Sequence, residues 1–159
     1  MNQLELSAPP AQGAAFPLYT ATVAVASEAA AHAGFSGRAI SDDGSLALAL
    51  RLPIELGGQG GGTNPEQLFA AGLAASFHAA LTTVARAKGI HFAGSIGIVA
   101  SVHLCGDRPD EGLFLTAELE VALPAMQPEQ ARSLMSEAER TCPYAKMTRT
   151  GLRAMFTLR

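Results

Sequence analysis

Charged residues are scarce in this chain, making up 16% of its 159 residues, whereas they form about a quarter of an average soluble domain. The net charge is −3 and the basic residues are scattered, which argues against a nucleic-acid-binding face. Hydrophobic residues reach 48%, and the length suffices for one domain with a buried core. So little charge predicts that a second copy of the chain covers part of the surface.

Cysteine and histidine are also few. Cys105 and Cys142 form no CxxC pair, and the four histidines are isolated from one another, so we expect neither a metal nor a cofactor. The N-terminus lacks the basic and apolar regions of a signal peptide, which predicts a cytoplasmic protein with reduced thiols. Residues 68–85 carry no charge but are dominated by alanine, so we expect a buried helix and no membrane span.

Strand and turn patterns predict a loosely ordered N-terminal arm over 1–17 and a single α+β domain over 18–159. Strands are expected at 18–26, 38–41, 46–53, 94–105, 113–123 and 152–159. Asn64 and Pro65 are typical of a helix start, and this helix should run to Lys88. It is apolar on every side, which predicts burial all round. A second helix from about residue 127 should be interrupted at Pro143.

Three features of the sequence could carry chemistry. The glycine-rich segment 57–62 lacks the Lys-Ser/Thr ending of a phosphate-binding loop, so it is better interpreted as a flexible cover. Ser76 lies inside the long helix, with no acidic residue nearby and with His78 on another face. These surroundings are more typical of a small packing residue than of a hydrolase nucleophile.

Cys142 is the third feature, and it directly precedes a proline. Two interpretations remain open for it. Arg140, Lys146 and Arg149 lie close in sequence and would favour a reactive thiolate. Alternatively, Cys142 is an inert buried cysteine. Cys105, at the end of a predicted strand, is interpreted as incidental.

Four segments occur in an order and spacing that resemble the organic hydroperoxide resistance branch of the OsmC/Ohr family: LYTATV, GRAISDDGSLALAL, LPIELGGQGGGTNPEQLFAAGLAASF and ERTCPYAKMTRTG. The resemblance extends from Leu18 to the C-terminus. It implies an intertwined homodimer in which antiparallel sheets wrap around long central helices. It also implies a thiol peroxidase that reduces organic and fatty-acid hydroperoxides through a disulfide, which lipoylated proteins or other dithiols then reduce.

The resemblance assigns roles to individual residues. Ser76 occupies the position of the peroxidatic cysteine, and Cys142 matches the resolving cysteine in the CPY motif. Glu55, in ELGG, matches a glutamate that helps to orient the first thiol. The family's arginine belongs in the loop after the first strand; here Arg38 is the nearest arginine, but it begins the next predicted strand, which weakens the match.

Two departures from the family pattern limit the predicted activity. A hydroxyl at position 76 is a poor nucleophile toward peroxide and has no sulfenic state. The loop that should hold the arginine is mostly alanine, with Glu28 and His32 as its strongly polar members. The sequence thus predicts a peroxidase impaired at Ser76, or alternatively a non-catalytic member that binds a hydrophobic peroxide or fatty acid in the dimer-interface pocket.

Three different origins would explain these departures. Ser76 could be a substitution introduced for study, although the family's arginine loop should then be present. The chain could instead be a natural divergent member that keeps the pocket without two-cysteine catalysis. It could also retain a weaker chemistry that uses Cys142 alone. The joint loss of thiol and arginine favours the second origin.

Overall fold

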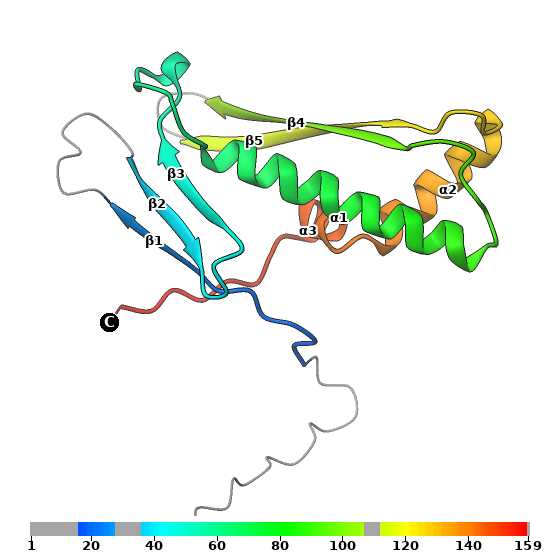
Figure 1. The fold of residues 1–159 in the computed structure, drawn as a ribbon, viewed down its shortest axis with the longest axis horizontal. Helices are drawn as coiled ribbons and strands as arrows, with labels where there is room; N and C mark the ends of the chain where they lie inside the picture. Colours follow the sequence, from blue (N-terminus) through cyan, green and yellow to red (C-terminus); the bar gives the residue numbers. More distant parts are fainter. Residues whose placement is uncertain (1–15, 28–35, 107–111, 159) are drawn as a thin grey trace, which may run out of the picture. The chain divides into compact units, whose positions relative to one another are not determined.

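The computed structural model describes residues 16–27, 36–106 and 112–158 (Figure 1). The chain divides into two compact units, the first ending at Gly62 and the second beginning at Thr63. Residues 1–15 of the predicted arm lie outside the described residues, and the prediction of one domain over 18–159 stays a prediction. The elements are β1 (Val23–Ser27), β2 (Ser36–Ser41), β3 (Ala47–Arg51), η1 (Ile54–Leu56), α1 (Pro65–Ala87), β4 (Gly97–Gly106), β5 (Leu113–Ala122), α2 (Pro128–Thr141) and α3 (Pro143–Thr150).

The first unit is an antiparallel sheet in the order β1-β2-β3. Its turn between β2 and β3 is fixed by the carboxylate of Asp43, which accepts hydrogen bonds from the Ser41 hydroxyl at 2.6 Å and the Ser45 amide at 3.0 Å. The Ser41 hydroxyl, followed by the Ser45 amide and hydroxyl, lowers the pKa of Asp43 below 3.8. The predicted hairpin is thus present, although β1 begins at Val23, later than expected.

In the second unit, α1 begins and ends where the sequence predicts. The Asn64 side chain accepts from the Gln67 amide at 2.8 Å, and the Gln67 side chain accepts from the Asn64 amide at 3.3 Å. This capping box satisfies two amides that the first helical turn leaves unpaired. Gly89, with φ of 67°, follows the C-terminus and adopts the left-handed conformation common there.

The prediction that α1 is buried all round is wrong for this chain taken alone. Its buried side chains form one stripe: Leu73, Phe77, Leu81, Val84 and Ala85. Ala71, Ala75 and Ala79 are exposed. The reason is that β4, α2 and α3 pack against only part of the helix surface. By length and composition α1 could also cross a membrane, a test that core helices of soluble proteins pass as well.

The core of the second unit lies between α1, α2 and the β4–β5 hairpin, which runs along α1 (Figure 1). Leu81 of α1 and Leu134 of α2 are almost fully buried there. The predicted α+β class with antiparallel sheets and a long helix is confirmed. The homodimer that the family resemblance implies stays a prediction.

Two expectations about the C-terminal part need correction. Pro143 does end α2, but it also begins a further helix, α3, because proline at the first helical position loses no hydrogen bond. The strand expected at 152–159 is absent: residues 151–158 have no regular structure and their side chains are exposed. Alternating apolar residues there find no partner strand within the described part of the chain.

Candidate functional site

Two side chains far apart in sequence meet at the predicted site. The Ser76 Oγ of α1 lies 3.3 Å from the Cys142 Sγ, and either atom can donate the hydrogen bond that joins them. Ser76 is half-buried, whereas Cys142 has no solvent exposure. The structure thus brings together the two residues to which the sequence assigns the family's redox roles.

The backbone at Cys142 fixes the position of its sulfur. Cys142 closes α2, donating its amide to the Ala138 carbonyl at 2.8 Å, and also begins α3, where its carbonyl accepts from the Lys146 amide at 3.0 Å. Its φ of −64° and ψ of 123° are extended, as expected for the residue before a proline. The thiol is therefore held at a rigid corner between two helices.

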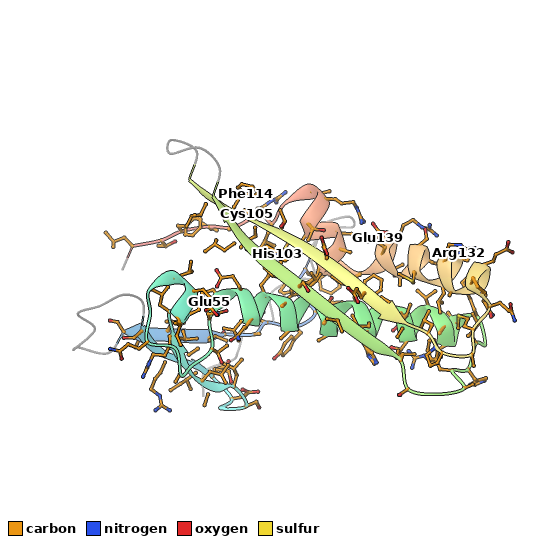
Figure 2. All side chains as sticks on the ribbon, turned by 90° about the horizontal axis from the view of Figure 1, so that it is seen from above. Glu55, His103, Cys105, Phe114, Arg132 and Glu139 are labelled. Carbon is orange, nitrogen blue, oxygen red and sulfur yellow. The ribbon has the colours of Figure 1, made fainter. Side chains whose placement is uncertain are left out.

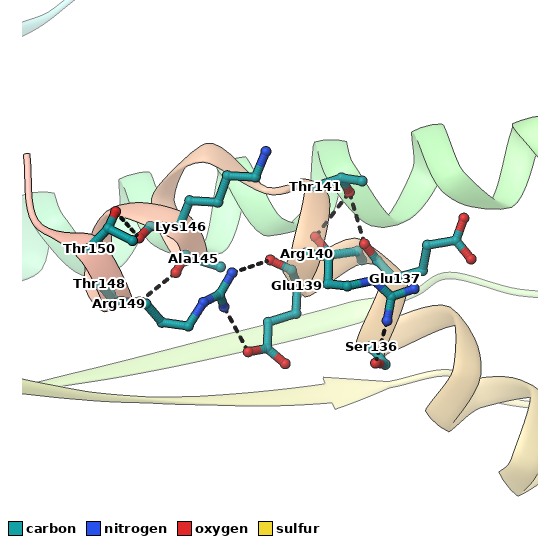
Figure 3. Close-up of polar contacts among 11 residues, drawn as sticks. Ser136, Glu137, Glu139, Arg140, Thr141, Ala145, Lys146, Thr148, Arg149 and Thr150 are labelled. Carbon is teal, nitrogen blue, oxygen red and sulfur yellow. Dashed lines mark hydrogen bonds and ion pairs between the residues drawn. The ribbon is translucent and has the colours of Figure 1, made fainter.

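Two basic residues near Cys142 in sequence, Arg140 and Arg149, are hydrogen-bonded to other side chains. Arg149 donates to a carboxylate oxygen of Glu139 at 2.8 Å, and Arg140 donates to the Ser136 hydroxyl at 3.1 Å (Figure 3). Within the described ranges, Ser76 is the only side chain hydrogen-bonded to the Cys142 sulfur. The interpretation of a thiol activated by basic neighbours therefore gains no support from these contacts.

Cys105 and Cys142 form no disulfide with each other, since both thiols are free. Cys105 lies on β4 opposite Phe114 of β5 (Figure 2), with its Sγ 3.7 Å from the Thr116 hydroxyl. Its interpretation as incidental stays a prediction.

Arg38 and Glu55 belong to the first unit and are described there alone. Arg38 lies within β2, between Ala26 and Ala49 on the neighbouring strands, and is exposed. Glu55 lies in η1 and is also exposed (Figure 2). Their participation in one site with Ser76 stays a prediction. Glu28 and His32 lie outside the described residues.

A cavity of about 770 Å³ opens in the second unit beside the site helix, and we name it the α1–β5 cavity. Its apolar lining includes Phe69, Leu73 and Phe77 of α1 and Leu119 of β5. Arg132 and Glu139 of α2 add charge to the lining (Figure 2). A volume of this order suits a small organic ligand.

Sequence reasoning missed one neighbour of the site, Tyr144. Its ring packs against Phe69 with ring centroids 6.4 Å apart and approaches Gly72, one helical turn before Ser76. The only signal in the sequence is an aromatic residue directly after Cys-Pro.

Comparison with known proteins identifies the family. The model of the OsmC-like protein family matches residues 58–154. An organic hydroperoxide resistance protein of Xanthomonas axonopodis pv. citri is 42% identical over 142 residues, covering 89% of this chain and 94% of that protein. The OhrB protein of Bacillus subtilis is 39% identical over 119 residues, covering 75% of this chain and 86% of the relative.

Solved structures agree with the sequence relatives. The organic hydroperoxide resistance protein of Legionella pneumophila superposes with a TM-score of 0.75 at 35% identity, over 86% of this chain and 93% of that chain. A Vibrio cholerae relative, with captopril bound in one of its active sites, gives 0.73 at 35% identity, over 85% and 88% of the two chains. The chain thus belongs to the OsmC-like family, in its organic hydroperoxide resistance branch.

Proposed function

We propose that this chain is an organic hydroperoxide resistance protein whose dithiol-dependent peroxidase reaction is impaired because an oxygen replaces a sulfur at Ser76. The observation that supports this proposal is the 3.3 Å contact between Ser76 Oγ and Cys142 Sγ. Because these two side-chain atoms are already in contact, we expect that cysteines at both positions would form the disulfide of the family's reaction.

The chemistry explains the impairment. In the two-cysteine reaction, the first thiolate attacks a peroxide oxygen, forming a sulfenic acid and releasing the alcohol; the second thiol then displaces water and forms the disulfide. The Ser76 hydroxyl cannot take the first role, because it ionises far less readily than a thiol and forms no sulfenic acid. Cys142 has no solvent exposure, so peroxide reaches it only if the surrounding residues move.

A second candidate function is binding without turnover. The α1–β5 cavity, about 770 Å³ with a mainly apolar lining, favours a hydrophobic hydroperoxide or a fatty acid as ligand. The Vibrio cholerae relative, which holds captopril in one of its active sites, supports the idea that the fold accepts small organic molecules. In this second function the chain binds and retains its ligand without reducing it.

The working form in this proposal is a cytoplasmic homodimer. The C-terminal segment exposes Met155, Phe156 and Leu158, each at least 90% accessible, and α1 exposes a stripe of alanines. Surfaces of this kind are typical of an interface. Light scattering after size-exclusion chromatography should give twice the mass of one chain. Removal of residues 152–159 should lower the measured mass to that of the monomer. A monomeric full-length chain would contradict the dimer.

Peroxide turnover tests the proposed function. A fatty-acid hydroperoxide is mixed with dihydrolipoamide and with the natural chain, Ser76→Cys, or Ser76→Cys combined with Cys142→Ser. We expect turnover above the protein-free rate with Ser76→Cys alone, one hydroperoxide consumed for each dithiol oxidised. Turnover by the natural chain at the rate of Ser76→Cys would contradict impairment, and an inactive, folded Ser76→Cys would contradict the peroxidase assignment.

Two further measurements separate the alternatives. If the natural chain consumes peroxide slowly, Cys142→Ser decides whether that thiol is responsible, because an unchanged rate removes Cys142 from the reaction. Calorimetric titration with an unoxidised fatty acid then tests sequestration. Stoichiometric binding without peroxide consumption would support the non-catalytic function.

A further inference from the structure

A second contact between α1 and α3 lies beside the Ser76–Cys142 pair. Gly72 precedes Ser76 by one helical turn and therefore lies on the same face of α1. Tyr144 follows Cys142 by two residues, in the first turn of α3. A Cβ at position 72 would lie 3.1 Å from the Cε1, 3.2 Å from the hydroxyl oxygen and 3.4 Å from the Cζ of Tyr144.

The presence of glycine at this point needs an explanation. Position 72 is in the interior of a 23-residue helix, where glycine is unfavourable relative to alanine. It is not among the glycines with positive φ, so the backbone does not require it. The close approach of the Tyr144 ring gives a reason for it, because a methyl group would push the ring away by a few tenths of an ångström.

The ring is held from a second side as well. Phe69, one turn nearer the start of α1, packs against Tyr144 with ring centroids 6.4 Å apart and ring planes 34° apart. Aromatic pairs at this distance attract each other beyond simple burial. Tyr144 thus packs on α1 against Phe69 and Gly72. Cys142, two residues earlier in the chain, is hydrogen-bonded to Ser76 of the same helix.

We infer that Tyr144 is a positioning residue. Its packing against Gly72 holds the start of α3 against α1 and so sets the distance between Cys142 Sγ and the side chain at position 76. This inference rests on the proposed function, in which that distance governs formation of the disulfide. It adds that the geometry is set by a contact outside the redox pair.

The reactivity of Cys142 in the natural Ser76 chain tests this inference directly. Cys105→Ser leaves Cys142 as the only thiol, and its rate with 5,5′-dithiobis(2-nitrobenzoate) is measured under native conditions. Because the thiol has no exposure, this rate reports local opening. Gly72→Ala should raise it about three- to tenfold, as expected when a ring is forced off its rotamer. Tyr144→Ala should raise it at least about threefold.

Two variants serve as controls. Tyr144→Phe keeps the ring and should restore the slow rate of the parent. Gly97→Ala introduces the same methyl group in β4, where a Cβ would meet Ala122 at an ordinary 3.7 Å, and should leave the rate unchanged. Adding Gly72→Ala to Tyr144→Ala should have no further effect, because the ring that the methyl group displaces is gone.

The disulfide equilibrium gives a second readout. In Ser76→Cys, the thiols at positions 76 and 142 transfer two electrons and two protons to glutathione disulfide. The protein disulfide forms, and glutathione disulfide is reduced to two molecules of glutathione. Gly72→Ala should lower this equilibrium constant about three- to tenfold. Urea unfolding should show no loss of stability for Gly72→Ala, since alanine is the better helix former.

The outcomes are distinguishable. Unchanged thiol rates in both Gly72→Ala and Tyr144→Ala would overturn the positioning role, as would additive effects in the double variant. Absence of any disulfide in Ser76→Cys would count against the proposed function, and the thiol rates in the natural chain would still decide the role of Tyr144.

Discussion

Oxidation of the Ser76→Cys variant should stabilise the protein by an amount that the structure allows us to work out. Residues 76 and 142 are separated by 66 positions, so a disulfide between them closes a long loop in the unfolded chain. The loop-entropy relation gives about 4 kcal/mol for a loop of this length. At roughly 2–4 °C per kcal/mol, the melting temperature should rise by about 8–16 °C.

The geometry of the folded chain predicts that this disulfide forms with little strain. Ser76 Oγ already lies 3.3 Å from the Cys142 sulfur, and replacing oxygen by the larger sulfur brings the two atoms closer. We therefore expect that small side-chain rotations bring the two sulfurs to bonding distance. Strain in the folded state would reduce the gain below the entropic value.

The assay is thermal unfolding followed by circular dichroism, with and without reductant, at one protein concentration and in a Cys105→Ser background. Ser76→Cys combined with Cys142→Ser is the matched control, whose midpoint should not depend on reductant. An oxidised protein that is cross-linked between chains, or one no more stable than its reduced form, would refute the geometric reasoning.

Three other predictions concern the fold. Asn64→Ala removes the acceptor of the capping box and should cost about 1 kcal/mol of unfolding free energy; an unchanged urea midpoint would contradict the cap's role. Leu134→Ala empties a core position that is 1% exposed and should cost about 2–5 kcal/mol, measured in the same way. The lowered pKa of Asp43 means that its ionised form stabilises the turn above pH 3.8, a contribution lost as pH falls through the folded pKa. Asp43→Asn should therefore flatten the acid limb of the stability profile, and an identical limb in both proteins would argue against this.

The parts of the fold that the sequence predicts well are those governed by local signals. The start of α1 follows from the Asn64 cap and Pro65, and the strands β2 to β5 follow from alternating apolar residues between turns. Pro143 predicts a break in the helix, but proline serves equally well as a first helical residue, and here it begins α3. The expected strand at 152–159 is absent for a different reason. Alternating apolar residues form a strand only where a partner strand is present.

The candidate site depends on contacts that no local pattern contains. Ser76 and Cys142 are 66 positions apart, and only the family resemblance predicted that they belong together. The Gly72–Tyr144 approach was invisible for the same reason, because a glycine inside a helix has no periodic signature. The placement of Arg38 and Glu55 relative to Ser76 remains a prediction of the resemblance.

The proposed exchange of sulfur for oxygen at position 76 is compatible with an intact scaffold, because backbone contacts, and not a disulfide, hold the site together. Backbone hydrogen bonds to Ala138 and from Lys146 fix Cys142 at the helix corner, and the capping box fixes the start of α1. The Ser76 hydroxyl has a hydrogen bond to the thiol, so both side chains of this pair have a partner. In the proposed function, loss of the reactive thiol removes the chemistry at little cost to stability, and Ser76→Cys should allow the disulfide to form.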